Sequence, residues 1–301
     1  MRPADLHRAV IDWFDANARP LPWREPGTSA WAVLVSEVMS QQTPVARVEP
    51  AWRAWMDRWP TPEALAAASP ADVLRAWDRL GYPRRALRLR ECASAVVARH
   101  GGVVPVGEED LLALPGIGAY TAAAVAAFAH GQRAVVLDTN VRRVLVRVAD
   151  GVALPSPSLT RAETARAEAL VPEEAEESAR WNAAVMELGA LVCTARSPDC
   201  GACPVSAGCR WLAAGRPADA HAARRRQQPW EGTDRQVRGR LMAVLRALPA
   251  GAHIGRSELL AHGGVPTGGD AEQAGRALDS LVRDGLVAQT QGTHDPRYAL
   301  P

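Results

Sequence analysis

Apolar and polar residues alternate with a helical period along most of this chain. Leu6, Val10, Trp13 and Phe14 recur three or four positions apart, which places them on one face of a helix over residues 6–17. The two-residue alternation of a half-buried strand is almost absent before residue 215. The pattern therefore predicts a mostly α-helical protein.

Capping and breaking residues divide this pattern into separate helices. Thr61-Pro62 and Ser69-Pro70 each combine a side-chain cap with proline at the first helical position. A helix from Ser69 is expected to run to Leu80. Further helices are expected over 29–42, 44–59, 84–100, 110–114, 120–130, 141–148 and 181–191, with a short one from 61.

The composition changes after Trp211. Residues 213–233 are rich in Ala, Arg, Pro and Gly and are predicted to be a linker. Beyond them we expect helices over 234–248, 257–262 (capped by Ser257) and 270–284, then a β-hairpin from 286–290 and 297–300. Three helices followed by a hairpin predict a small winged-helix-like α+β domain over 234–301.

Charge changes this picture little. The net charge is only +2, but arginines cluster, whereas acids gather between residues 163 and 177. The clusters are Arg84, Arg85, Arg88 and Arg90; Arg142, Arg143 and Arg147; and Arg224, Arg225 and Arg226. They indicate either a basic face for phosphates or a general use of Arg for Lys. With early charges at the start and no run of about 18 apolar residues, we expect a cytoplasmic protein without membrane contact.

Four of the five cysteines lie within 17 residues, as Cys193, Cys200, Cys203 and Cys209. Four thiolates can hold either a [4Fe–4S] cluster or a structural zinc ion. Zinc sites commonly pair two Cys-x2-Cys knuckles, and only Cys200 and Cys203 form one here. The spacing therefore favours iron–sulfur and leaves zinc open, while a disulfide is disfavoured because nothing marks a secreted chain.

Residues 114–121 read Leu-Pro-Gly-Ile-Gly-Ala-Tyr-Thr and join two predicted helices. Gly116 and Gly118 allow a left-handed backbone and let a phosphate approach bare N–H groups at the start of the next helix. This is typical of a helix-hairpin-helix, which grips a phosphate without reading sequence. The alternative is an ordinary helix–helix turn.

Two carboxylates are candidates for chemistry. Asp138 ends an apolar run before a helix, where it either caps the helix or is held ionised for catalysis. Glu37 lies in a mixed helical segment and is either exposed, the commoner fate of Glu, or enclosed by apolar groups. Enclosure would raise its pKa and let it donate a proton.

Together these residues resemble the MutY family of adenine DNA glycosylases, within the superfamily that contains endonuclease III. The resemblance covers residues 5–212 and rests on several motifs. They are Leu-Pro-Trp-Arg at 21–24, Ser-Glu-Val-Met at 36–39 with Gln-Gln-Thr at 41–43, Leu-Gly-Tyr at 80–82, the 114–121 hairpin, the 138–143 stretch, Met-Glu-Leu-Gly-Ala at 186–190 and the cysteine loop.

The resemblance implies a two-lobed helix-hairpin-helix glycosylase domain over residues 1–212. A six-helix lobe would cover about 29–138, and the N-terminal helix would join 139–212 in a second lobe around a structural [4Fe–4S] cluster. Bifunctional relatives have a lysine nucleophile where this chain has Tyr120, so a monofunctional enzyme is implied. It would flip and excise adenine mispaired with 8-oxoguanine or guanine, in base excision repair.

The resemblance also assigns roles to residues. Glu37 would protonate adenine and later help to activate water, Asp138 would stabilise the cationic sugar, and Asn140 and Tyr120 would support them. Residues expected at the DNA are Gln42 and Thr43 near the opposite base, Arg24 in the adenine pocket, Tyr82, Arg142, and Leu114, Gly116 and Gly118 of the hairpin. The implied partner is duplex DNA, bound by a monomer at a bacterial nucleoid.

The chain departs from the family at three points. Pro83 replaces a second aromatic residue, Ala183 replaces a residue that contacts adenine, and no Nudix-like domain follows the linker. Two alternatives remain on the sequence alone. One is a mismatch thymine glycosylase of the same superfamily, and the other is an iron–sulfur DNA-binding protein without catalysis.

Overall fold

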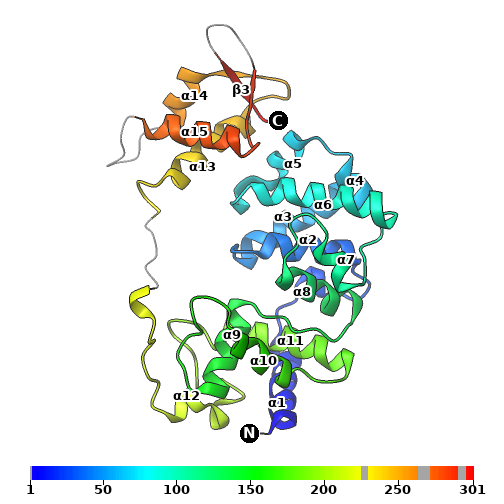
Figure 1. Ribbon diagram of the computed structural model, residues 1–301, viewed down its shortest axis with the longest axis vertical. Coiled ribbons are helices and arrows are strands. Elements are labelled where there is room, and N and C mark those ends of the chain that lie inside the picture. Colours follow the sequence, from blue (N-terminus) through cyan, green and yellow to red (C-terminus); the bar gives the residue numbers. More distant parts are fainter. Residues whose placement is uncertain (1, 225–229, 264–271, 291–295) are drawn as a thin grey trace. The chain divides into compact units, whose positions relative to one another are not determined.

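A computed structural model describes residues 2–224, 230–263, 272–290 and 296–301. Helices dominate it, as predicted (Figure 1). No helix within these ranges is long and apolar enough to cross a membrane. The chain forms two compact units. One contains residues 2–37, 105–113 and 117–224; the other contains 38–104, 114–116 and the described part of 230–301.

The first unit is built from the N-terminal helix, the start of α2 and most helices between residues 108 and 224. Its elements are α1 (Pro3–Asn17), η1 (Pro22–Arg24), the start of α2 (Ala30–Ser40), α7 (Glu108–Leu112), α8 (Ala119–His130), α9 (Thr139–Leu145), the π-turn η3 (Val146–Asp150), α10 (Arg161–Leu170), α11 (Ala175–Leu191), η4 (Ser206–Gly208), α12 (Arg210–Ala213) and η5 (Ala222–Arg224). Helices α1, α9 and α11 pack together around buried Val10, Val144 and Trp181. This core places the end of α11 beside the cysteine segment.

The second unit holds the rest of α2, four α-helices between residues 45 and 100, and the C-terminal elements. They are α3 (Val45–Arg58), α4 (Pro62–Ala66), α5 (Pro70–Trp77), η2 (Asp78–Leu80), α6 (Arg84–His100), α13 (Asp234–Ala247), β1 (Ile254–Gly255), α14 (Arg256–Gly263), α15 (Gln273–Arg283), β2 (Ala288–Thr290) and β3 (Arg297–Ala299). Trp55 lies edge-on to Trp59 and Trp77 with ring centroids 4.6 and 5.5 Å apart. These tryptophans are core packing.

The predicted helices are present, and the predicted caps form. Thr61 and Ser69 accept hydrogen bonds from the backbone N–H groups of Ala64 and Asp72. The helix from Ser69 was predicted to reach Leu80, but α5 ends at Trp77 because Asp78 takes a positive φ of 37°. The α-helix predicted over 141–148 was also misjudged at its end, since α9 gives way to a π-turn from Val146.

The C-terminal elements have the predicted winged-helix order. Their sheet has the order β1-β3-β2 and is antiparallel, with Tyr298 opposite both Ile254 and Gln289. The two-residue strand β1 was not predicted, because it is too short to show a period. The predicted Ser257 cap is wrong, since α14 already begins at Arg256. Predicted features at 264–271 and 291–295 lie outside the described residues.

The two compact units do not coincide with the domains expected from the sequence. The C-terminal elements fall in the unit of 38–104, and the cysteine segment falls in the unit of the N-terminal helix. The unit with the cysteine segment also contains residues 105–113 and 117–138, which were expected in the six-helix lobe. The domain boundaries at 1–212, 213–233 and 234–301 remain a proposal.

Candidate active site and iron–sulfur loop

Glu37 is an enclosed acid on α2. Ser29 starts this helix by accepting a hydrogen bond from the backbone N–H of Ala32, and apolar residues then bury most of it. Glu37 is only 8% exposed. Burial raises the pKa of Glu37 to about 7, although a 2.9 Å hydrogen bond from the Tyr120 hydroxyl acts in the opposite direction. At neutral pH Glu37 is therefore divided between an acid and its conjugate base.

Tyr120 lies in the first turn of α8, directly after the glycine hairpin. Burial, followed by the charges of Glu37 and Asp138, raises the pKa of Tyr120 well above its ordinary value. The phenol therefore stays protonated and serves as a hydrogen-bond donor to Glu37.

Asp138 caps helix α9, as its sequence position predicts. One carboxylate oxygen accepts from the backbone N–H of Val141 at 2.6 Å, and the other accepts from the Asn140 amide at 2.7 Å. Burial raises the pKa of Asp138, and these hydrogen bonds oppose that rise. The Asp138 charge also contributes to the raised pKa of Glu37, so the two carboxyl groups interact.

Arg143 connects this capped aspartate with the cysteine segment. Its guanidinium donates to the Asn140 side-chain oxygen at 2.7 Å and to the backbone carbonyls of Gly189 and Cys193 at 2.6 and 2.7 Å. Gly189 is needed here, because a Cβ on it would lie 2.7 Å from that of Asn140. Helices α9 and α11 therefore approach closely at the point where Asn140 is oriented.

Glu187 is a buried acid that the sequence reasoning missed. Its carboxylate is fully buried and accepts from Arg19 at 2.6 and 2.8 Å and from Arg24 at 3.0 Å. Burial alone would raise its pKa, but the two arginines lower the pKa of Glu187 to about 2. The available signal was a Glu on an otherwise apolar stretch of α11. Arg24, expected at the adenine, is held by its hydrogen bond to Glu187. Its positive charge also acts to lower the pKa of Glu37.

Gln42 and Thr43, expected beside the opposite base, and Tyr82, expected at the DNA, lie on two turns of the second unit. Gln42 is exposed and has a φ of 55°, and Tyr82 is 46% exposed with a φ of 46°. Thr43 is buried, and its hydroxyl donates to the Leu80 carbonyl at 3.0 Å and accepts from Arg85 at 3.1 Å. Its side chain therefore supports the turn.

The glycine hairpin is only partly as predicted. Gly116 has a φ of 80°, whereas Gly118 has an extended backbone and acts as the N-cap of α8. The expectation of a left-handed Gly118 is therefore wrong. Leu114 is buried. Both glycines are exposed, and a Cβ on Gly118 would meet open space.

Arg142 does not have the geometry of a DNA contact. Its guanidinium donates to both oxygens of Glu163 at 3.0 and 2.9 Å and to the carbonyls of Ser156 and Ser158. The Arg142 and Glu163 side chains are only 10% and 8% exposed. The prediction at this position is corrected, because Arg142 instead fastens α10 to α9.

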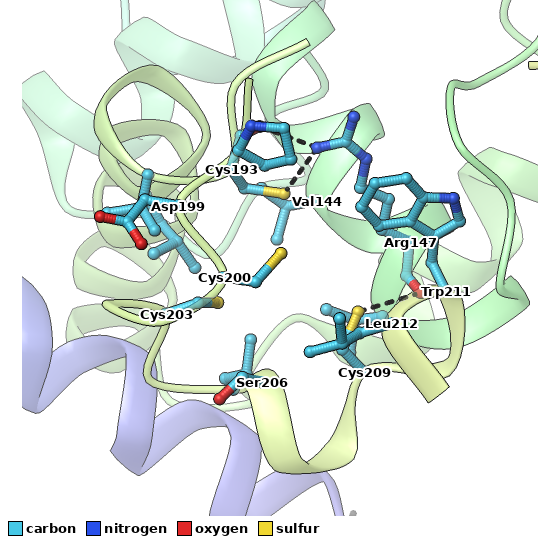
Figure 2. Close-up of a pocket in the computed structure, with 15 residues that line it drawn as sticks. Val144, Arg147, Cys193, Asp199, Cys200, Cys203, Ser206, Cys209, Trp211 and Leu212 are labelled. Atoms are coloured by element: carbon cyan, nitrogen blue, oxygen red, sulfur yellow. Dashed lines mark hydrogen bonds between the residues drawn. The ribbon is translucent and has the colours of Figure 1, made fainter. Parts of the chain in front are cut away.

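The four cysteines of the loop surround one space (Figure 2). This space encloses about 360 Å³, part of it open to solvent, and has apolar walls that include Val144, Leu188 and Val192. Within the described residues, no three side chains converge closely enough to ligate a single ion. Cys92, the fifth cysteine, is fully buried elsewhere, and burial raises its pKa to about 12.

Arg147 lies beside the cysteine loop and contacts one of its sulfur atoms. Its buried guanidinium donates to the Cys193 sulfur at 3.3 Å and to the carbonyl of Thr194 at 2.8 Å, and it stacks 4.4 Å from the Trp211 ring. Four cysteines around one apolar space with a cationic rim fit a multi-iron cluster.

Comparison with known proteins decides between the possibilities left open by sequence. The model of the HhH-GPD superfamily base excision DNA repair proteins matches residues 35–168, and that of the iron-sulfur binding domain of endonuclease III matches 193–209. The adenine DNA glycosylase of Mycolicibacterium smegmatis is 53% identical over 97% of this chain and 94% of its own length. This chain belongs to the adenine DNA glycosylase family. Its cysteine loop is accordingly an iron–sulfur site, with Cys193 and Cys209 at the two ends of the matched segment.

Further relatives and solved structures are also similar to this chain. The adenine DNA glycosylase of Mycobacterium tuberculosis is 52% identical over 97% of this chain and 92% of its own length. The human adenine DNA glycosylase is 44% identical over 67% of this chain and 38% of its own length. A thermostable thymine-DNA glycosylase superposes with a TM-score of 0.63 and 26% identity over 70% of this chain and 97% of its own. An endonuclease III–DNA complex superposes with a TM-score of 0.60 and 21% sequence identity, over 72% of this chain and 100% of its own. This superposition confirms the predicted fold.

Proposed function

We propose that this protein excises adenine from duplex DNA in which adenine is mispaired with 8-oxoguanine or guanine. The observation that carries the proposal is the enclosed acid Glu37, with a pKa of about 7, hydrogen-bonded by Tyr120 and interacting with the capped Asp138. Membership of the adenine DNA glycosylase family supports the choice of base.

In this proposal Glu37 supplies the proton that adenine needs in order to leave. A pKa near 7 keeps a large share of the acid protonated at neutral pH and leaves it able to take a proton back from water. Tyr120 orients the carboxyl group through its 2.9 Å hydrogen bond. Because no lysine stands at this position, the reaction is hydrolysis without strand cleavage.

Asp138 would act on the sugar. Positive charge grows on the sugar ring as the glycosidic bond breaks, and a nearby carboxylate stabilises it directly or through a transient bond. The bonds from Val141 and Asn140 oppose the rise in the pKa of Asp138 that burial causes and orient its carboxylate, while Arg143 fixes Asn140. The same bonds that cap α9 would therefore prepare the catalytic carboxylate.

The DNA would be held by residues that read no sequence and by residues at the opposite base. Gly116, Gly118 and the backbone of Leu114 would bind a phosphate, and Gln42 and Tyr82 would lie beside the orphaned base. Arg24, whose Nη1 group is buried, would line the adenine pocket. We further propose that the protein acts as a monomer at the bacterial nucleoid.

Cys193, Cys200, Cys203 and Cys209 would ligate a [4Fe–4S] cluster whose contribution is structural. Arg147 and the apolar walls would hold these ligands, and Arg143 would link Cys193 to Asn140. No step of the glycosidic cleavage passes through the cluster in this account.

A panel of duplexes tests the proposal. Adenine would be placed opposite 8-oxoguanine, guanine and thymine, and thymine opposite guanine, and alkali would convert each abasic product into a strand break. We expect breaks at adenine opposite 8-oxoguanine and guanine. Breaks confined to thymine opposite guanine would instead favour a thymine glycosylase, and binding without breaks would favour a non-catalytic protein.

A further inference from the structure

One guanidinium, that of Arg85 in the first turn of α6, ties together the two turns that carry Gln42 and Tyr82. Its Nη1 donates to the carbonyls of Val38 at 2.9 Å, Met39 and Gln41 at the end of α2. Its Nη2 donates to the Thr43 hydroxyl and to the carbonyls of Leu80 and Gly81, each at 3.1 Å. Arg85 thus caps α2 and binds the 80–82 turn at once.

Both turns have backbones that need outside support. Gln42 and Tyr82 have φ values of 55° and 46°, which lie in the left-handed region that side-chain-bearing residues rarely adopt. Such conformations persist only where surrounding bonds fix them. The Thr43 hydroxyl adds a direct link between the turns by donating to the Leu80 carbonyl.

The Arg85 side chain also contacts aromatic rings. Its guanidinium carbon lies 5.6 Å from the centroid of the Tyr82 ring and 5.2 Å from that of Trp77. Burial lowers the pKa of Arg85 to about 10, so it stays charged at neutral pH. Because these acceptors are carbonyls and a hydroxyl, they leave its positive charge unneutralised. Tyr82, 46% exposed, therefore rests on a fixed cation.

We propose that Arg85 is a positioning residue that fixes the Gln42 turn and the Tyr82 turn relative to each other and so sets how the protein reads the base opposite adenine. This rests on the proposed function, which places Gln42 and Tyr82 at that base. Arg85 itself would touch no reacting atom. Its planar fork matters, because Nη1 and Nη2 bind separate sets of acceptors and lysine has only one nitrogen at its end.

The same helix offers a matched control. Arg90 is also partly buried on α6 and donates from Nε to the carbonyl of Ala68 at 2.6 Å. Arg90→Gln therefore removes an arginine–carbonyl bond from α6 without touching either turn. The test compares Arg85→Gln, Arg85→Lys and Arg90→Gln with the parent protein.

The first readout is amide hydrogen exchange of the free protein over residues 40–43 and 80–82. Arg85→Gln and Arg85→Lys should each speed exchange about tenfold in both segments, whereas Arg90→Gln should leave both unchanged. Faster exchange in one segment only, or equally in Arg90→Gln, would overturn the link between the turns. This readout needs no DNA, so it stands even if the proposed function fails.

The second readout uses duplexes holding a non-cleavable 2′-fluoro-adenosine opposite 8-oxoguanine or guanine. Both Arg85 variants should bind the 8-oxoguanine duplex about tenfold more weakly than the parent protein does. The ratio of affinities for the 8-oxoguanine and guanine duplexes should therefore be smaller in the variants. Single-turnover excision at saturating enzyme should fall by less than about threefold. An unchanged preference with faster exchange would overturn the reading role, whereas a parent protein that excises no adenine would overturn the proposed function instead.

Discussion

At the scale of single residues, the burial of Glu37 determines the expected pH dependence. In the proposed mechanism, excision needs Glu37 protonated and Asp138 ionised. Since the pKa of Glu37 is about 7, the single-turnover rate should fall as pH rises through 7. At low pH the rate should fall again as Asp138, whose pKa is also raised, becomes protonated.

Tyr120→Phe tests the cause of that profile. The hydrogen bond from Tyr120 lowers the pKa of Glu37, so its loss should raise that pKa and move the alkaline limb of the profile to higher pH. The measurement is the single-turnover rate between pH 5 and 9, with Tyr298→Phe in β3 as the matched control. A limb that stays in place would show that Glu37 is not the titrating acid.

Glu187 gives a second prediction at this scale. Glu187→Gln leaves the Arg19 and Arg24 cations without their buried carboxylate. Removing one partner of a buried ion pair costs about 3 kcal/mol, so chemical denaturation should show a loss of that size in the free energy of unfolding. Asp15→Asn, which breaks the exposed pair with Arg180, should cost less than about 1 kcal/mol. Equal losses would contradict the structural importance of Glu187.

At the scale of elements, substitutions of two glycines distinguish an effect on DNA binding from an effect on helix packing. They are Gly118 of the hairpin and Gly189 of α11. Gly118 has an extended backbone and open space at its Cβ position, so Gly118→Ala should fold normally and weaken DNA binding by crowding a phosphate. Gly189→Ala should instead destabilise the protein, because its Cβ would meet Asn140. Thermal unfolding and DNA affinity measured on both variants check this pair. Equal melting temperatures would be inconsistent with the close approach of α9 and α11.

The sequence predicted elements well where local signals are strong. Caps at Thr61 and Ser69 and the apolar period of residues 84–100 predicted helices that form at those positions. It could not predict the end of α5, which depends on the backbone of Asp78, or β1, which exists only through its pairing with β3. Tertiary pairing carries no periodic signal in so short a segment.

The candidate site was predictable to a similar degree. The motif positions indicated Glu37, Tyr120, Asp138 and Asn140, and the structure brings Glu37, Tyr120 and Asp138 into mutual electrostatic contact. Arg142 was misjudged, because a sequence cannot show that Glu163 lies opposite it. Glu187 was missed for the converse reason, since its partners Arg19 and Arg24 are distant in the chain.

At the scale of the whole molecule, the role proposed for the cysteine loop is structural, in support of a reaction that would occur at Glu37 and Asp138. Removing iron by chelation should weaken DNA binding and lower the melting temperature, since Arg143, Arg147 and α12 all pack on this loop. Loss of iron–sulfur absorbance, thermal unfolding and duplex affinity should change together. An iron-free protein that keeps full DNA affinity and stability would contradict a structural role.

The central claim is that Glu37 is the acid that releases adenine, and one measurement tests it most directly. Single-turnover excision from a duplex with adenine opposite 8-oxoguanine would be compared for the parent protein and Glu37→Gln, with duplex affinity measured on both. The account predicts that Glu37→Gln loses excision by about a thousandfold or more while it still binds the duplex. Excision within about tenfold of the parent rate would contradict it.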